Sequence, residues 1–402
     1  MKNLQFIIIL LALSTILSSC GTDLNEGGNV LDTPGGSIDT PGSETTVAGT
    51  IDLDNLDNYE NQPIPNYINE DNTTFNDIRD EVATLGRVLF YDKAMSTDNT
   101  ISCASCHKQE LAFGDDLRQS EGVNGLTGRH SMRLINARFA EEERFFWDER
   151  ANTLEDQTTM PIQDHIEMGF SGEDGNPDFD DLIVKLGEID YYSELFTIAY
   201  GDAQITEVRM QNALAQFIRS IQSFDSRYDQ GRQQVNNNNQ DFPNFTEEEN
   251  LGKRLFMQNV DFAGNTGNRI GGGLGCQNCH QAPEFDINDN SENNGVINTA
   301  ADVNGRDITV ERSPSLRDLF NQNGELNGPL MHTGRMDERD MVEHYNNISD
   351  DNNPNLDNRL ARGDGQNLNM TELEKDALIA FLKTLTGNDV YTNEKWSDPF
   401  IN

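Results

Sequence analysis

Basic residues are scarce in this chain of 402 residues. Its 29 lysines and arginines stand against 69 aspartates and glutamates, which gives a formal net charge of −40. Binding to nucleic acid depends on clustered lysine and arginine side chains, so the composition argues against a nucleic acid as partner. A charge of this size is typical of a solvated acidic surface, and steering of a basic partner protein is the alternative.

Long hydrophobic runs are also scarce, and the one clear run covers residues 6–17. It is shorter than the roughly 20 residues that a membrane-spanning helix needs. It follows Met1 and Lys2 and leads to a small-residue segment ending in Cys20. This order predicts a lipoprotein signal peptide over residues 1–19 and lipidation of Cys20, with a short membrane anchor as the alternative. The mature protein would then be periplasmic and anchored to a membrane.

Residues 20–72 lack the apolar side chains from which a core is built. They are rich in Gly, Asp, Asn, Thr and Pro, and no basic residue occurs between Lys2 and Arg79. Such a stretch cannot bury enough apolar surface to offset the loss of chain entropy. It is predicted to be a flexible, disordered acidic linker that holds the rest of the protein away from the membrane.

Cysteine is rare, and apart from Cys20 the chain has four. They form two CxxCH motifs that contain Cys103, Cys106 and His107, then Cys276, Cys279 and His280. In such a motif two thiols attach to the vinyl groups of haem, and the adjacent imidazole becomes an axial ligand of the iron. Two copies predict two covalently bound c-type haems. A zinc site or disulfides are the alternatives.

The chain repeats itself around these motifs. Residues 85–90 (LGRVLF) and 251–256 (LGKRLF) each precede a CxxCH motif, and each half closes with an amphipathic helical pattern, near residues 208–224 and 373–385. A polar linker lies at residues 231–243. Alternating strand patterns are scarce. The predicted fold is all-α with long loops, in two cytochrome c-like domains over residues 73–235 and 236–402.

Four further residues stand at fixed intervals. Trp147 is followed by Gln157 ten residues on, by Pro161 four later and by Glu167 six after that. In these intervals the chain resembles the bacterial dihaem cytochrome c peroxidase family, which includes the dihaem enzyme that matures the tryptophan-derived cofactor of methylamine dehydrogenase. The resemblance runs from about residue 85 to residue 387 and includes the motifs at residues 313–317 and 328–334.

The resemblance implies a role for each of these residues. Glu167 would move a proton between the two oxygens of hydrogen peroxide, and Gln157 would bond to groups in the same distal pocket. Pro161 would leave space above the iron, and Trp147 would lie on the electron route between the haems. The N-terminal haem would be peroxidatic, and the C-terminal haem would receive electrons. Taken singly, Trp147 could be a core residue and Glu167 a surface carboxylate.

The chain departs from the family in the loop after the first CxxCH. Peroxidases of the family carry a His that binds the peroxidatic iron about sixteen residues after this motif, and counting from His107 leads to Val123. His130 is the nearby histidine, as an alternative ligand or as a loop or interdomain contact, and the second role is favoured. Relatives also bind calcium between domains, with an Asn where this chain has His130 and with carbonyls at Asn327 and Pro329. The presence of His130 puts calcium in question.

The C-terminal haem needs a sixth ligand. The family uses Met in peroxidases and Tyr in the maturation enzyme, and the best match here is Tyr345, with Met341 and His344 as alternatives. His332 is expected to support a haem propionate or an interdomain contact.

The resulting functional hypothesis is a peroxidase that reduces hydrogen peroxide with electrons from a small donor protein, a cytochrome c or a cupredoxin. The alternatives are a dihaem oxidase that modifies a partner protein and a non-enzymatic electron-transfer lipoprotein. The family also allows a homodimer.

Overall fold

The computed structural model describes residues 46–47, 51–141, 144–287, 291–309, 312–349, 352–363 and 365–400. The signal peptide and Cys20 lie outside this part. Contacts divide the chain into residues 1–43 and 44–402, and all that follows concerns the second unit. Among the described residues, no helix has the length and apolar character needed to cross a membrane.

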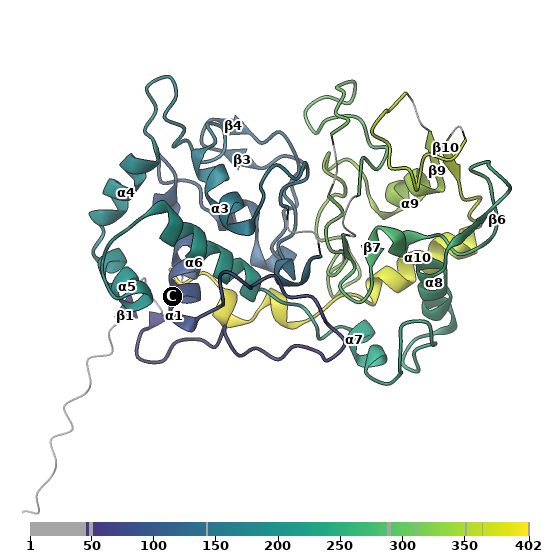
Figure 1. Ribbon diagram of the computed structural model, residues 1–402, viewed down its shortest axis with the longest axis horizontal. Helices are drawn as coiled ribbons and strands as arrows, with labels where there is room; N and C mark the ends of the chain where they lie inside the picture. Colours follow the sequence, from purple (N-terminus) through teal and green to yellow (C-terminus); the bar gives the residue numbers. More distant parts are fainter. Residues whose placement is uncertain are drawn as a thin grey trace, which may run out of the picture. The chain divides into compact units, whose positions relative to one another are not determined.

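The second unit is rich in helix and has few strands (Figure 1). Its α-helices are α1 (Asp80–Tyr91), α2 (Cys103–Cys106), α3 (Leu154–Gln163), α4 (Phe179–Gly187), α5 (Asp190–Tyr200), α6 (Glu207–Ser220), α7 (Arg227–Arg232), α8 (Glu247–Met257), α9 (Glu338–Asn346) and α10 (Glu372–Lys383). The described strands form short antiparallel pairs, namely β1 (Thr46–Val47) with β2 (Ile51–Asp52), β3 (Glu121–Gly122) with β4 (Gly125–Leu126), β5 (Val260–Phe262) with β6 (Arg269–Gly272), β7 (His280–Gln281) with β8 (Asp286–Ile287), and β9 (Asn347–Ser349) with β10 (Gly365–Asn367). The structure is therefore rich in helix, and the all-α prediction did not include these hairpins.

The repeated LG motif marks the closest helix crossing in each half. A Cβ atom on Gly86 of α1 would lie 2.0 Å from the carbonyl oxygen of Ala213 in α6. In the same way, a Cβ atom on Gly252 of α8 would lie 1.9 Å from the carbonyl oxygen of Ala377 in α10. Only glycine allows two helix backbones to approach so closely. The sequence repeat is thus a repeat of one helix pair.

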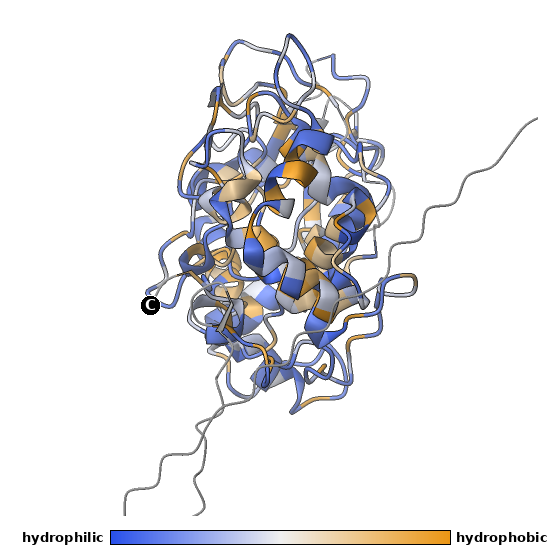
Figure 2. Cartoon of the chain, turned by 90° about the vertical axis from the view of Figure 1, so that its left-hand side faces the viewer, coloured by the Kyte–Doolittle hydropathy of each residue, from blue (hydrophilic) through white to orange (hydrophobic). Residues whose placement is uncertain are grey.

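Each half has its own hydrophobic cluster. One gathers mainly residues 51–221 around α1 and α6, and the other gathers residues 228–385 around α8 and α10. The helices carry apolar and polar residues along the same element, whereas the outer loops are mostly hydrophilic (Figure 2). This is the pattern of helices that bury one face.

Two segments depart from the predicted domain boundaries. Within the predicted linker, Ile51 and Tyr59 belong to the first cluster, and Tyr59 is fully buried. At the other end of the chain, Val390 and Trp396 also enter the first cluster, although residues 236–402 were assigned to the second domain. Figure 1 shows the C-terminus beside α1 while α10 lies beside α8. A few well-spaced aromatic residues are enough to pack these segments into the first cluster. The average composition of a segment does not reveal such packing.

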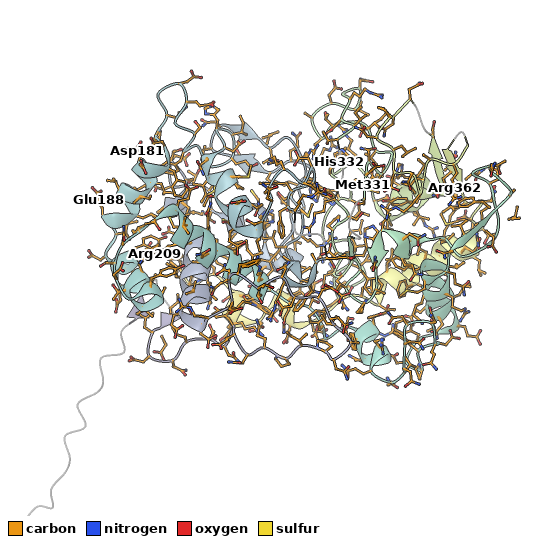
Figure 3. All side chains as sticks on the ribbon, viewed as in Figure 1. Asp181, Glu188, Arg209, Met331, His332 and Arg362 are labelled. Carbon is orange, nitrogen blue, oxygen red and sulfur yellow. The ribbon has the colours of Figure 1, made fainter. Side chains whose placement is uncertain are left out.

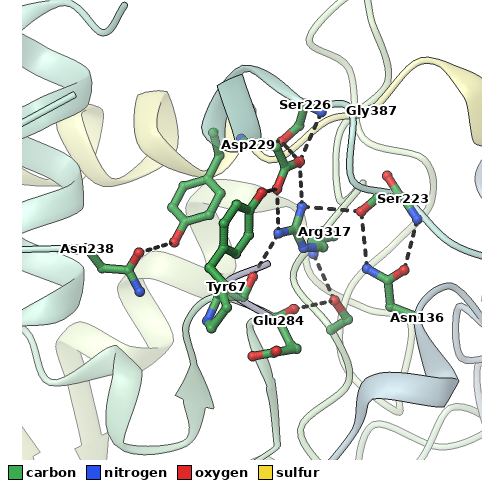
Figure 4. A network of polar contacts seen from close by, with 12 residues as sticks. Tyr67, Asn136, Ser223, Ser226, Asp229, Asn238, Glu284, Arg317 and Gly387 are labelled. Carbon is green, nitrogen blue, oxygen red and sulfur yellow. Dashed lines mark hydrogen bonds and ion pairs between the residues drawn. The ribbon is translucent and has the colours of Figure 1, made fainter. Parts of the chain in front are cut away.

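A buried ion pair joins segments that are distant in sequence (Figure 4). The guanidinium of Arg317 donates to both carboxylate oxygens of Asp229 in α7 at 2.9 Å, and the hydroxyl of Tyr67 donates to the same carboxylate at 2.8 Å. Arg317 also donates to the carbonyl of Pro283 at 2.8 Å. Burial alone would raise the pKa of Asp229, but Arg317 holds that pKa below its usual value. The network fixes the loop after the second CxxCH motif against α7.

Candidate active site

The first CxxCH motif opens directly onto a cavity. Cys103 and Cys106 lie on α2, whose start is capped reciprocally by Ser102 and Ser105, and His107 follows as the helix C-cap. Both cysteines and His107 line the cavity together with Gln157, Pro161 and Glu167, and apolar side chains complete the wall. Residues that are separated by sixty positions in the sequence therefore face one space.

The imidazole of His107 is prepared to bind a metal through one nitrogen. Its Nδ1 lies 3.3 Å from the carbonyl oxygen of Phe113, so this nitrogen carries the proton and Nε2 is the free donor. Burial lowers the pKa of His107, which favours the neutral imidazole that a metal ligand requires.

Gln157 and Pro161 share helix α3 in a way that explains their spacing. Pro161 lies inside the helix and has no N–H to donate to the carbonyl of Gln157, four residues earlier. The last turn of α3 is therefore loosened where it borders the cavity, and the chain turns at Asp164 towards Glu167.

The loop that carries Glu167 is held from two sides. The Asp164 carboxylate accepts from the backbone N–H groups of Ile166 at 2.8 Å and Glu167 at 3.0 Å. From the other side, the N–H of Val123, in the turn between β3 and β4, donates to the carbonyl of Glu167 at 3.0 Å. A Cβ atom on Gly122 would lie 2.1 Å from the carbonyl oxygen of Ile166, so the hairpin and the loop are in close contact.

The carboxyl of Glu167 has a pKa shifted towards neutrality. Burial raises its pKa to about 7, the charge of Asp164 adds to this rise, and Arg150 opposes it. A group with such a pKa can both give and take a proton at physiological pH.

The second CxxCH motif opens onto a larger cavity of about 450 Å³. Cys276, Cys279 and His280 line it, as do two of the three predicted sixth ligands, Met341 and Tyr345. The third, His344, does not line this cavity, and its Nε2 lies 2.9 Å from the carbonyl oxygen of Asn294. The geometry thus favours Tyr345 or Met341 over His344.

Trp147 lies where the two halves meet, beside the second site. Its indole N–H donates to the carbonyl of His130 at 2.7 Å, and its ring centroid is 6.2 Å from that of His332. His332 belongs to the second half (Figure 3), and the N–H of His130 donates to its carbonyl at 2.8 Å. Trp147 also shares a small cavity with His280 and Tyr345. The indole therefore joins the junction of the halves to the surroundings of the second motif.

His130 is placed at this junction and not among the residues that line the first cavity. Its Nδ1 lies 2.8 Å from the carbonyl oxygen of Leu117. Burial lowers the pKa of His130 to about 4 and that of His332 also to about 4. Both imidazoles are neutral at pH 7. The halves are in contact here through the backbone hydrogen bond from His130 to His332 and through the ring contact of His332 with Trp147.

The donor groups fit two haems. Each cavity presents two unpaired thiols and one neutral imidazole within a largely apolar wall, which are the groups that c-type haem attachment uses. The two cysteine pairs line separate cavities, so they cannot converge on one four-cysteine zinc site.

A family model described as di-haem cytochrome c peroxidase matches residues 80–237, which include the first CxxCH motif and the residues from Trp147 to Glu167. This part of the chain matches the di-haem cytochrome c peroxidase family. The chain is 28% identical over 321 residues to the methylamine utilization protein MauG of Methylophilus methylotrophus, covering 76% of this chain and 83% of the relative. It is 27% identical to the cytochrome c551 peroxidase of Nitrosomonas europaea, covering 77% and 80%.

Solved structures show the fold of this di-haem family. A MauG-like protein associated with microbial copper homeostasis aligns with a TM-score of 0.65 and 26% identity, covering 85% of this chain and 99% of the other. The diheme peroxidase BthA of Burkholderia thailandensis aligns with a TM-score of 0.59 and 21% identity, covering 82% and 90%. The match to this family supports two haem cofactors and an oxidoreductase.

Sequence reasoning did not identify the residues that hold Glu167. Asp164 and Gly122 act through backbone contacts across the cavity rim. Asp164 carries a local signal, because Asp often accepts from the N–H groups two and three residues later. Gly122 carries none, since its role depends on a partner forty-five residues away.

Proposed function

We propose that this protein is a cytochrome c peroxidase, which reduces hydrogen peroxide with two electrons and two protons to two molecules of water. The observation that carries the proposal is the presence of Glu167 and Gln157 in the same cavity as Cys103, Cys106 and His107. A haem held by these cysteines would supply the iron that binds peroxide and exchanges electrons. A pure electron carrier has no use for a buried carboxyl with a pKa near 7 beside this position.

In this proposal the side chains divide the remaining work. Glu167 accepts a proton from bound peroxide and returns it to the departing oxygen, which its pKa of about 7 allows in both directions. The amide of Gln157 orients groups in the same pocket. Pro161 keeps the end of α3 open towards the cavity, and Trp147 lies on the route for electrons from the second site.

We further propose that the protein is an exported lipoprotein, attached through Cys20 and facing the periplasm, with a small cytochrome c or cupredoxin as electron donor. Residues 1–19 would be removed as a signal peptide. A homodimer and a calcium ion between the halves are family features that no described contact of this chain requires. His130 in the place of the calcium-binding Asn argues against the ion.

Oxidation of a partner protein is the second candidate. It is favoured by one observation, the position of Tyr345 in the cavity of the second CxxCH motif, because Tyr is the ligand that the resemblance associates with the maturation enzyme. Replacing Tyr345 by Met would test this candidate. If the protein is a peroxidase, the Tyr345→Met variant should keep its peroxide turnover with a reduced donor, and this result would count against the second candidate.

The decisive experiment combines haem content with turnover. Denaturing mass spectrometry should show two haem additions, and the purified protein should consume peroxide when a reduced donor is present. Glu167→Gln should lower turnover by about 10²-fold or more while both haems remain, because only the proton carrier is lost. The matched control is Glu173→Gln, an exposed carboxylate further along the same loop, which should leave turnover unchanged. Equal turnover in Glu167→Gln and the wild type would refute the assignment.

A further inference from the structure

Two adjacent tyrosines share one buried carboxylate near the first site. Asp92 follows α1 and caps the start of the 3-10 helix Lys93–Met95, where its Oδ1 accepts from the N–H of Ala94 at 2.8 Å. Its Oδ2 accepts from the hydroxyls of Tyr191 and Tyr192, each at 2.6 Å. The two rings have centroids 4.8 Å apart. One carboxylate oxygen therefore serves two phenols that are in ring contact.

The pair leads from the first CxxCH motif towards the surface. Tyr192 is fully buried in the first hydrophobic cluster, and Cys103 of the first CxxCH motif packs against the same cluster. Tyr191 is only partly buried, and its ring centroid is 6.2 Å from that of Phe400 near the C-terminus. The phenol of Tyr192 thus lies in the first hydrophobic cluster, whereas the phenol of Tyr191 is partly exposed to solvent.

The arrangement exceeds what helix capping requires. Capping uses Oδ1 alone, through Ala94, and Oδ2 is left for the phenols. The nearby cation, Lys185, donates to the carbonyl of Ser96 at 2.7 Å and not to Asp92. Burial raises the pKa of both phenols, so neither loses its proton to water readily. A phenol can be oxidised at moderate cost only when a proton acceptor is in contact with it, and Asp92 meets this condition.

We propose that Tyr192 and Tyr191 form a redox relay, which carries one-electron oxidising equivalents from the first haem site to the surface when hydrogen peroxide is present without a reduced donor. The proposal rests on the proposed function, because peroxide reduction at that site supplies the oxidant. Tyr192 gives up one electron towards the haem site, and its phenolic proton passes to Asp92. Tyr191 then reduces Tyr192, which regains the proton from Asp92 while the proton of Tyr191 moves to Asp92.

The overall reaction balances. Two tyrosine phenols and one hydrogen peroxide give two tyrosyl radicals and two waters. Such a relay would draw oxidising equivalents away from the haem site. It would leave a radical on Tyr191, which a spin trap can label.

The test treats the protein carrying both haems with hydrogen peroxide and a nitroso spin trap, without donor, and maps adducts by peptide mass spectrometry. In the wild type we expect adducts on Tyr191. In Tyr192→Phe the adducts on Tyr191 should fall several-fold, although Tyr191 is still present and equally exposed. The matched control is Tyr200→Phe on the same helix, whose hydroxyl donates to the carbonyl of Arg209 and not to Asp92, and which should label as the wild type does. Phe keeps the ring packing in both variants, and haem content verifies the fold.

Two outcomes would overturn the relay. Equal labelling of Tyr191 in Tyr192→Phe would mean that the surface residue is oxidised directly. Absence of label on Tyr191 in a wild-type preparation that consumes peroxide with a reduced donor would refute the relay and leave the peroxidase function intact. A preparation that consumes no peroxide even with donor would refute both.

Discussion

At the scale of single residues, Glu284 makes the stability of the second half depend on pH. Burial raises its pKa from 4.5 to about 7. The folded protein therefore retains a proton that the unfolded chain releases near pH 4.5, and the contribution of Glu284 to the free energy of unfolding falls as the pH rises from about 4.5 to about 7. Glu284→Gln, which stays neutral, should be more stable than the wild type at pH 8 by on the order of 1 to 3 kcal/mol.

Urea denaturation at pH 4 and pH 8 would measure this difference, which should vanish at pH 4. Glu248→Gln, an exposed change in the first turn of α8, is the control and should show no such pH dependence. If Glu284→Gln is less stable than the wild type at pH 8, the carboxylate of Glu284 is ionised and paired, and Arg317, whose charge lowers its pKa, is the candidate partner.

Residues of fixed spacing were the easiest to predict. The CxxCH motifs and the series from Trp147 to Glu167 are local patterns, and the structure brings the first motif, Gln157, Pro161 and Glu167 to one cavity. The Arg317 network escaped prediction because its partners, Tyr67 and Asp229, are far away in the sequence. Nothing local distinguishes a buried arginine from an exposed one.

At the scale of elements, the β3–β4 hairpin determines where Glu167 lies. Gly122→Ala would place a Cβ atom 2.1 Å from the carbonyl oxygen of Ile166 and 2.8 Å from the Cα of Glu167, so the loop must move. A displacement of about 1 Å in catalytic geometry can cost about 10²-fold in rate, and we expect a loss of this order in peroxide turnover. Steady-state kinetics on protein of unchanged haem content would measure it.

Gly128→Ala is the control for this change, because a Cβ atom there meets nothing within 4 Å. If Gly122→Ala keeps full turnover, the clamp between the hairpin and the loop does not position Glu167.

The same hairpin bears on activation. Its turn contains Val123 and Asn124 and offers no nitrogen ligand of the imidazole kind, whereas His130 lies at the junction with Nδ1 near the carbonyl of Leu117. We expect the N-terminal haem of the oxidised resting protein to be high-spin and to react with peroxide without prior reduction. Electron paramagnetic resonance of the wild type and of His130→Ala would test this. A low-spin signal that becomes high-spin on the substitution would identify His130 as the ligand instead.

Helices with a regular hydrophobic period were predictable. The two amphipathic patterns predicted α6 and α10, and the repeated LG segments lie in α1 and α8. The hairpins were not predictable, since strands of two to four residues are too short to show an alternating pattern.

At the scale of the whole molecule, the C-terminal segment holds the first half together. Trp396 is buried in the first cluster, its indole N–H donates to the hydroxyl of Ser220 at 3.2 Å, and its carbonyl accepts from Tyr91 at 2.6 Å. Trp396→Ala should lower the free energy of unfolding by about 3 to 5 kcal/mol through the cavity it leaves. Phe75→Ala, at a fully exposed aromatic, should change it little.

Denaturation followed at both haems would show which half is affected. If the N-terminal haem site of Trp396→Ala unfolds under the same conditions as that of the wild type, residues 390–396 cover the first half without stabilising it. The predicted boundaries missed this connection because composition describes a segment by itself, whereas burial of Tyr59 and Trp396 depends on a surface made by other parts of the chain.

Burial of Trp396 in the first cluster also constrains the order in which the protein can be made. Residues 390–396 leave the ribosome after all the rest of the first half. The core around α1 and α6 therefore stays incomplete until the second half has been synthesised. The first half cannot complete its folding before the second half has been made.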